Sequence, residues 1–202
     1  MGYEAEAEAT LRQWVDTYAK LWVGEAGWRF RSFAQAVREL GTVQRPAPWP
    51  GDRGQWAPGR CFAAATDYAE TTGAVYVEGF VPVPDLTQWP VFEHAWCLRD
   101  GAVADPSLPE GSAALYFGIA LADGYRRAEQ ARRGTHAVLT TDPRQPWSLV
   151  NNDALCQGLP EAAVLSGASR AELAIPLCEQ GRNLQVIAVG DRQEVVAVDR
   201  DP

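Results

Sequence analysis

Several features are scarce or absent in this sequence, and each absence argues against a class of protein. Only two histidines and four cysteines occur among 202 residues, and no two cysteines form a CxxC pair. Because a structural zinc site needs several closely spaced ligands of these types, we expect no metal. No apolar run approaches the roughly 20 residues that cross a bilayer, so we expect no membrane partner.

Positive charge is also scarce. The chain has 18 basic residues against 26 acidic ones, a net charge of −8, and only one of the basic residues is lysine. An acidic protein is a poor counterion for a phosphate backbone, so we expect no nucleic-acid partner. The N-terminal sequence MGYEAEAEAT lacks the basic-then-apolar order of a signal peptide, which leads us to expect a cytoplasmic protein. The oligomeric state is left open.

The four cysteines are candidate disulfide partners, nucleophiles or core residues. Cys61, Cys97, Cys156 and Cys178 can form two disulfides, but the missing signal peptide favours free thiols. Each thiol is then either a nucleophile or a small buried hydrophobe.

The composition is that of a folded protein, with 47% hydrophobic and 10% aromatic residues. A chain of this length fits one domain, which we predict for residues 1–202. Four parts are expected within it. Residues 1–41 form a helical part and residues 42–60 a loop rich in proline and glycine. Residues 61–121 form a core that carries the candidate site, and residues 122–202 a final part with a helix and strands.

Apolar periodicity predicts the helices. Apolar residues recur at three- and four-residue steps over 11–22 and 30–40, and a glycine follows each run. Residues 61–72 are rich in alanine and precede Gly73, which predicts a third helix with Cys61 in its first turn. The four prolines of residues 42–59 exclude a regular element there.

The remaining pattern is mostly that of strands. β-branched and aromatic residues followed by turn signals predict strands and hairpins, with one helix among them. Strands are expected at 74–83, 115–121 and 136–140, and the helix at 123–133. Hairpins are expected at 91–105 and, around a Gly-Asp turn, at 184–198. Helices followed by mostly antiparallel strands indicate an α+β fold, with N-terminal helices packed on an antiparallel sheet.

The hairpin EHAWCLRDGAVADPSL brings a histidine close to an aspartate. With Asp100-Gly101 as a two-residue turn, alternation places His94 and Asp105 on one face and Cys97 on the other. Diagonal neighbours lie about 7–8 Å apart between α-carbons, a distance that side chains bridge. The pair is either a structural hydrogen bond or part of a site.

Cys61 supplies the third member of a candidate site. The first turn of a helix stabilises negative charge and favours a thiolate. A thiolate, a histidine base and an aspartate that orients the base are the requirements of nucleophilic catalysis.

These residues resemble the transglutaminase-like superfamily of cysteine enzymes. In that superfamily a cysteine at a helix start is followed by an HAW strand and then by a strand ending in DPT or DPS. Here the corresponding residues are Cys61, His94-Ala95-Trp96 and Asp105-Pro106-Ser107, and the resemblance covers residues 55 to about 107. It implies a transglutaminase-like or papain-like form of the α+β fold, with Cys61, His94 and Asp105 as catalytic residues and no cofactor.

The resemblance also implies the reaction. Cys61 attacks an amide or thioester carbonyl of a peptide, a protein or another acyl donor, His94 transfers the proton and Asp105 orients the imidazole. The resulting thioester passes to water in a peptidase or amidase, or to an amine in a transferase. The alternative is a catalytically inactive transglutaminase-like scaffold that acts through protein contacts.

Further site residues are expected around this core. Papain-like enzymes carry a glutamine six positions before the nucleophile, where this chain has Gln55, and many transglutaminase-like enzymes use a tryptophan, for which Trp56 is the candidate. Either side chain is expected to stabilise the oxyanion. The sequence Arg60-Cys61-Phe62 departs from the usual Gln-Cys-Trp and leaves the choice of donor open. Glu78, Trp89 and Trp96 are expected to line the substrate groove, with core packing as the alternative for both tryptophans.

Overall fold

The computed structural model describes residues 3–21, 26–51, 54–57, 59–83, 90–140, 153–165, 184–189 and 192–197. The chain divides into two compact units, residues 1–170 and 171–202. Each unit is described by itself, and the single domain expected from the sequence stays a prediction.

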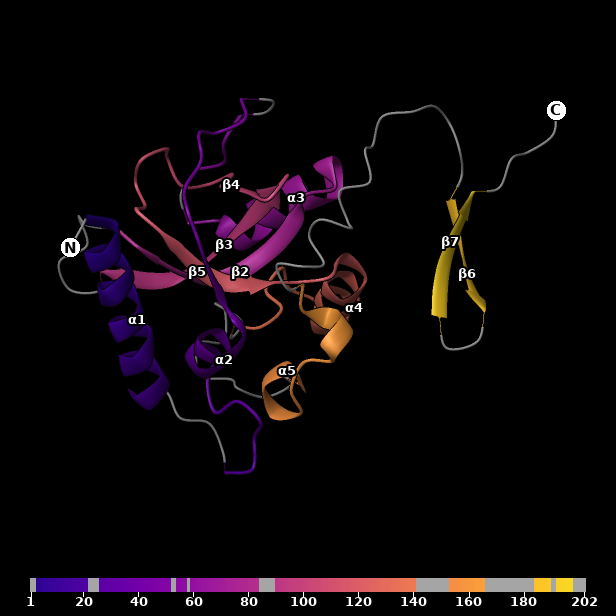
Figure 1. Cartoon of the computed structure of the whole chain (residues 1–202), viewed down its shortest axis with the longest axis horizontal. Helices are drawn as coiled ribbons and strands as arrows, with labels where there is room; N and C mark the ends of the chain where they lie inside the picture. Colours follow the sequence, from indigo (N-terminus) through magenta and orange to yellow (C-terminus); the bar gives the residue numbers. More distant parts are fainter. Residues whose placement is uncertain are drawn as a thin grey trace. The chain divides into compact units, whose positions relative to one another are not determined.

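The first unit is built on a five-stranded antiparallel sheet (Figure 1). The strands pair in the order β1-β5-β2-β3-β4, so that β2 lies at the centre between β5 and β3. Their bounds are β1 Thr42–Gln44, β2 Val75–Pro82, β3 Val91–Arg99, β4 Ala102–Ala104 and β5 Tyr116–Ala120. With the helices described next, this confirms the predicted α+β class.

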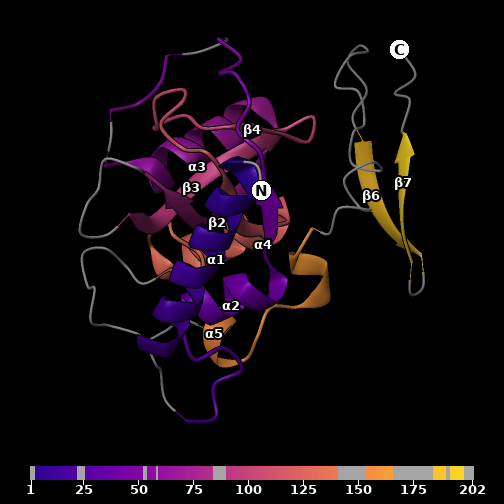
Figure 2. The same ribbon diagram turned by 60° about the vertical axis from the view of Figure 1, so that its left-hand side comes forward.

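The helices form largely where the apolar periodicity predicts them. They are α1 Tyr3–Leu21, α2 Phe33–Leu40, α3 Cys61–Thr72, α4 Asp123–Arg133 and the short α5 Asp153–Cys156, with a 3₁₀ turn at Glu161–Ala163. The Ser32 side chain caps α2 by accepting the N–H of Gln35, and Gly73 ends α3 in the left-handed conformation at φ 72°. Helices α1 and α2 pack side by side, as Figure 2 shows.

The sheet has a hydrophobic core on each face, because side chains alternate along a strand. On one face, Tyr76, Phe80 and Cys97 pack in a core that includes buried residues of α1, α2, α3 and α5. On the other face, a smaller core gathers Trp96 and Tyr116 with residues of β2, β4 and the segment before β5. The sheet therefore separates two environments, and His94 lies on the second face.

Two segments differ from the sequence-based prediction. Residues 42–44 form the edge strand β1 against β5, since the first proline of the loop comes only at Pro46. The strand predicted at 136–140 is absent, because the N–H groups of residues 138–140 donate to the carboxylate of Glu78 instead of to a neighbouring strand.

The second unit contains the predicted C-terminal hairpin. Strands β6 Leu184–Val189 and β7 Arg192–Ala197 pair antiparallel, with Val189 opposite Arg192. The predicted Gly-Asp turn between them lies outside the described residues. Across the described part of the chain, no helix combines the length and apolar character needed to cross a membrane.

Candidate active site

The β3–β4 hairpin places a histidine and an aspartate in direct contact. Asp100 and Gly101 both have positive φ, 52° and 79°, and Arg99 pairs with Ala102, as a two-residue turn requires. The predicted parity is thereby confirmed. His94 Nε2 lies 2.7 Å from Asp105 Oδ2, and both side chains are buried.

Asp105 is held as a carboxylate by several donors. Its Oδ1 atom accepts the backbone N–H groups of Ser107 at 3.0 Å and Leu108 at 2.9 Å, and its Oδ2 atom accepts the Tyr116 hydroxyl at 3.1 Å. Burial alone raises the pKa of Asp105, but the charge and hydrogen bond of His94 and the two backbone N–H groups lower it below its usual value. The aspartate is therefore ionised at neutral pH and accepts a proton-bearing Nε2 of the imidazole.

His94 is enclosed by aromatic rings. Its ring stacks on Trp96 with centroids 6.1 Å apart and meets Phe92 edge-on at 5.7 Å. Burial lowers the pKa of His94, but the charge and hydrogen bond of Asp105, followed by those of Cys61, raise it to about 9. The buried Nδ1 atom makes no hydrogen bond of normal geometry. Nε2 is thus hydrogen-bonded to Asp105, and Nδ1 is the ring nitrogen that can exchange a proton with another group.

Cys61 is the first residue of α3 and is partly exposed. Arg60, at the N-cap, provides no side-chain hydrogen bond to the helix, so the N–H groups of the first turn have no cap of that kind. Cys61 also contributes to the raised pKa of His94 through hydrogen bonding and charge. The thiol therefore lies at the open end of a helix dipole and within interaction range of the imidazole.

The other described cysteines are not part of this arrangement. Cys97 is fully buried, donates its Sγ–H to the Ala65 carbonyl at 3.2 Å, and has a pKa raised far above its usual value by desolvation. Cys156 is partly buried in α5. Cys178 lies outside the described residues.

Trp96 supports the histidine from the core, which corrects its predicted place in a substrate groove. Its side chain is fully buried, its indole Nε1 donates to Gln44 Oε1 at 2.7 Å, and its ring packs on Tyr116 at 5.0 Å. Gly118 makes this packing possible, because a Cβ there would lie 2.5 Å from the Trp96 ring. The alternative of core packing is the one that the structure shows.

Glu78 does not line a substrate groove either, which corrects the prediction for this residue. It lies on β2 beside β3, as the prediction required, but it is fully buried. Its carboxylate accepts the Tyr76 hydroxyl at 2.8 Å and the N–H groups of residues 138–140. Desolvation raises the pKa of Glu78 while these four hydrogen bonds oppose the rise. Glu78 therefore fixes the segment after α4 and does not face a ligand. Trp89 lies outside the described residues.

The two oxyanion candidates are placed differently. Gln55 donates from Nε2 to the backbone carbonyls of Asp105 at 2.9 Å and Leu108 at 3.0 Å, so both hydrogens of its amide are already hydrogen-bonded. This corrects its assignment as an oxyanion donor. The backbone N–H of Trp56 is likewise bonded to the Pro106 carbonyl at 2.6 Å, which leaves its indole as the side-chain donor. Both residues tie the loop before Cys61 to the loop after β4.

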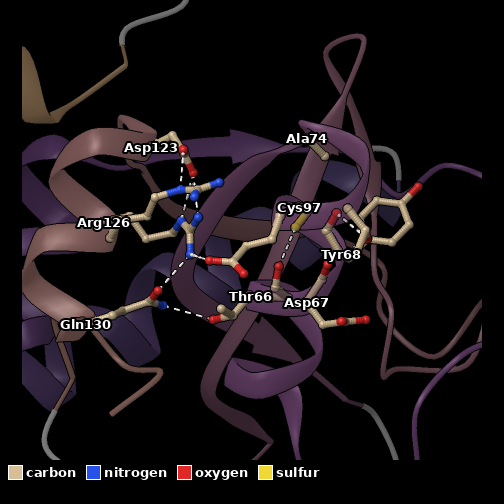
Figure 3. A network of polar contacts seen from close by, with 12 residues as sticks. Thr66, Asp67, Tyr68, Ala74, Cys97, Asp123, Arg126 and Gln130 are labelled. Carbon is tan, nitrogen blue, oxygen red and sulfur yellow. Dashed lines mark hydrogen bonds and ion pairs between the residues drawn. The ribbon is translucent and has the colours of Figure 1, made fainter. Parts of the chain in front are cut away.

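Two groups of residues near the site were not found from the sequence. One is Tyr116, whose contact with Asp105 connects β5 to the residue after β4, although these two strands are not neighbours in the sheet. The other is the network in Figure 3, in which buried Arg126 pairs with Asp123 and with Glu70, and Gln130 bonds to Thr66 at 2.9 Å. The spacing of Asp123, Arg126 and Gln130 along α4 is the one sequence signal for it. The network fixes α3, the helix that begins with Cys61, against α4.

No known family model, curated protein or solved structure matches this chain. The geometry of the site therefore carries the assignment of function. Within the described residues, no group of three or more histidine, cysteine or acidic side chains is placed to hold a metal ion.

Proposed function

We propose that this protein is a cysteine-dependent acyl-transfer enzyme of transglutaminase-like type, with Cys61, His94 and Asp105 as its catalytic triad. One observation carries the proposal. A buried histidine is fixed by an ionised aspartate through Nε2, its Nδ1 atom makes no hydrogen bond of normal geometry, and its pKa responds to the thiol at the start of α3. A cytoplasmic location is part of the same proposal.

The reaction begins with a proton on His94. With a pKa of about 9, the imidazole is positively charged at neutral pH, and a neighbouring imidazolium stabilises a thiolate. The Cys61 sulfur attacks the acyl carbonyl and forms the carbon–sulfur bond. The backbone N–H groups at the start of α3 then stabilise the oxyanion.

The tetrahedral intermediate collapses when the bond to the leaving group breaks. His94 donates its proton to the departing amine or thiol, and a thioester on Cys61 remains. His94, now neutral, removes a proton from the acceptor as the acceptor attacks the thioester. Asp105 stays ionised throughout and stabilises the charged imidazole. Water as acceptor gives hydrolysis, and an amine gives a new amide.

One observation favours the alternative, a scaffold without catalytic activity. His94 is only 3% exposed and offers almost no surface to a substrate, whereas Cys61 is partly exposed. A scaffold has no need of a reactive thiol. The reactivity of Cys61 therefore separates the two candidate functions.

The test is alkylation by iodoacetamide at pH 6, read by mass spectrometry of peptides from the folded protein. We expect Cys61 to react faster than Cys156, which is also partly exposed and serves as the internal control. His94→Ala should slow the labelling of Cys61 and leave that of Cys156 unchanged. Equal rates at both cysteines, or no effect of His94→Ala, would argue for the scaffold.

A further inference from the structure

A second candidate site is a cavity of about 250 Å³ where α1 and α2 meet strands β2 and β3. Aromatic rings form much of its wall. They come from α1, α2 and β2 and are Tyr18, Phe33 and Phe80, while β3 contributes Val91 to Glu93, with the Phe92 ring turned to the other face of the sheet. None of the triad residues lines this cavity.

The rings are fixed by one another and by one hydrogen bond. Phe33 stacks on Phe80 with centroids 5.1 Å apart, and Tyr18 lies 5.7 Å from the same Phe80 ring. The Tyr18 hydroxyl donates to the Val91 carbonyl at 2.6 Å. The aromatic wall is therefore preformed, and a ligand need not order it on binding.

One acidic group stands in this apolar wall. Glu93 is accessible from outside, yet among the described residues its carboxylate has no hydrogen-bond or ion-pair partner. Surrounding protein atoms desolvate it and, with the charge of Glu78, raise the pKa of Glu93 to about 7. A carboxylate of this kind gains more from a cationic partner than a fully hydrated one does.

We propose that this cavity binds an organic ammonium ion that carries an aromatic or short aliphatic group. The apolar group lies among the rings of Tyr18, Phe33 and Phe80, where it is removed from water, and the ammonium ion pairs with Glu93. Aromatic faces attract cations, which adds to the preference for a positive ligand. The same carboxylate repels an anion. This site is independent of the acyl-transfer proposal, since it uses none of the triad residues.

The test uses phenethylammonium as the probe, with 2-phenylethanol as its neutral counterpart and 3-phenylpropionate as its anionic one. Binding is followed at pH 8.5 by ¹H–¹⁵N chemical shifts of the whole chain, so that Glu93 is ionised and the ammonium is charged. We expect saturable shifts at Phe92 and Glu93 with phenethylammonium, and binding at least about fivefold weaker with the alcohol.

Two variants and one control test the assignment. Glu93→Gln keeps the shape of the side chain and should weaken phenethylammonium binding at least about fivefold, to the level of the alcohol. Ala34→Leu fills the cavity and should abolish binding of both compounds. Glu6→Gln removes an exposed carboxylate from α1, 12 residues before Tyr18, and should bind as the parent does.

Several results would overturn the proposal. These are unchanged affinity in Glu93→Gln, equal binding of the alcohol and the ammonium ion, preference for 3-phenylpropionate, or no saturable shifts at the cavity. Glu93→Gln removes a desolvated charge and should not lower the unfolding temperature at this pH. Its result therefore stands even where Ala34→Leu does not fold.

Discussion

The hydroxyl of Tyr116 tests how far the site depends on groups outside the triad. Tyr116→Phe deletes one donor to Asp105 Oδ2, at 3.1 Å, and keeps the ring that packs on Trp96. A hydrogen bond to a charged acceptor contributes about 1.5–3 kcal/mol, and the carboxylate that loses it stays buried. We therefore expect Tyr116→Phe to reduce the free energy of unfolding by about 2 kcal/mol at pH 7.

The pH dependence distinguishes this contact from simple packing. The pKa of Asp105 is lowered in the folded state, so its ionised form stabilises the fold above the ordinary pKa, and that contribution is lost as the pH falls through the folded pKa. Tyr116→Phe removes a donor that favours the carboxylate, so the pKa of Asp105 should rise. The stability difference between parent and variant should then shrink in acid.

Two measurements check this expectation. Urea unfolding at pH 7 and near pH 3.5 gives the stability difference, and ¹⁵N chemical shifts of the ring give the pKa of His94. A more basic Asp105 should hold the His94 proton more tightly, so the pKa of His94 should rise above that of the parent. Tyr125→Phe, a half-buried tyrosine of α4, is the matched control. A pH-independent stability difference, or an unchanged pKa of His94, would refute the reasoning.

Three further outcomes are expected. In rate assays on folded protein, Cys61→Ala should abolish acyl transfer, His94→Ala should be nearly as severe, and Asp105→Asn should be milder. The double variant Cys61→Ala/Asp105→Ala should be hardly slower than Cys61→Ala alone. Because the pKa of His94 is about 9 in the folded state, the protonated imidazole stabilises the protein fully below about pH 6.5. Up to about 3 kcal/mol of the free energy of unfolding should be lost as the pH rises through 9. Urea unfolding should show this loss in the parent and not in His94→Gln. Gly118→Ala should lower stability by about 1–3 kcal/mol in the same assay, because its Cβ meets a buried ring; unchanged stability would contradict that packing.

Part of this site was determined by local sequence. Asp100-Gly101 specifies a two-residue turn, because both positions need positive φ, and strand alternation then fixes His94 and Asp105 on one face. Likewise, the glycine-containing loop and the alanine-rich run place Cys61 at a helix start. These features depend on backbone preferences of neighbouring residues, which a sequence displays directly.

The partners of the buried polar groups were decided only by the tertiary structure. Gln55 fits the pattern of an oxyanion donor, but in the fold its amide donates to the backbone carbonyls of Asp105 and Leu108. Glu78 takes up the N–H groups of residues 138–140, so a segment with strand-like sequence does not become a strand. Tyr116 of β5 reaches Asp105, which follows β4, although β5 and β4 are separated in the sheet by β2 and β3. A buried polar group must find a hydrogen-bond partner, and which partner it finds depends on residues that only the packed chain brings together.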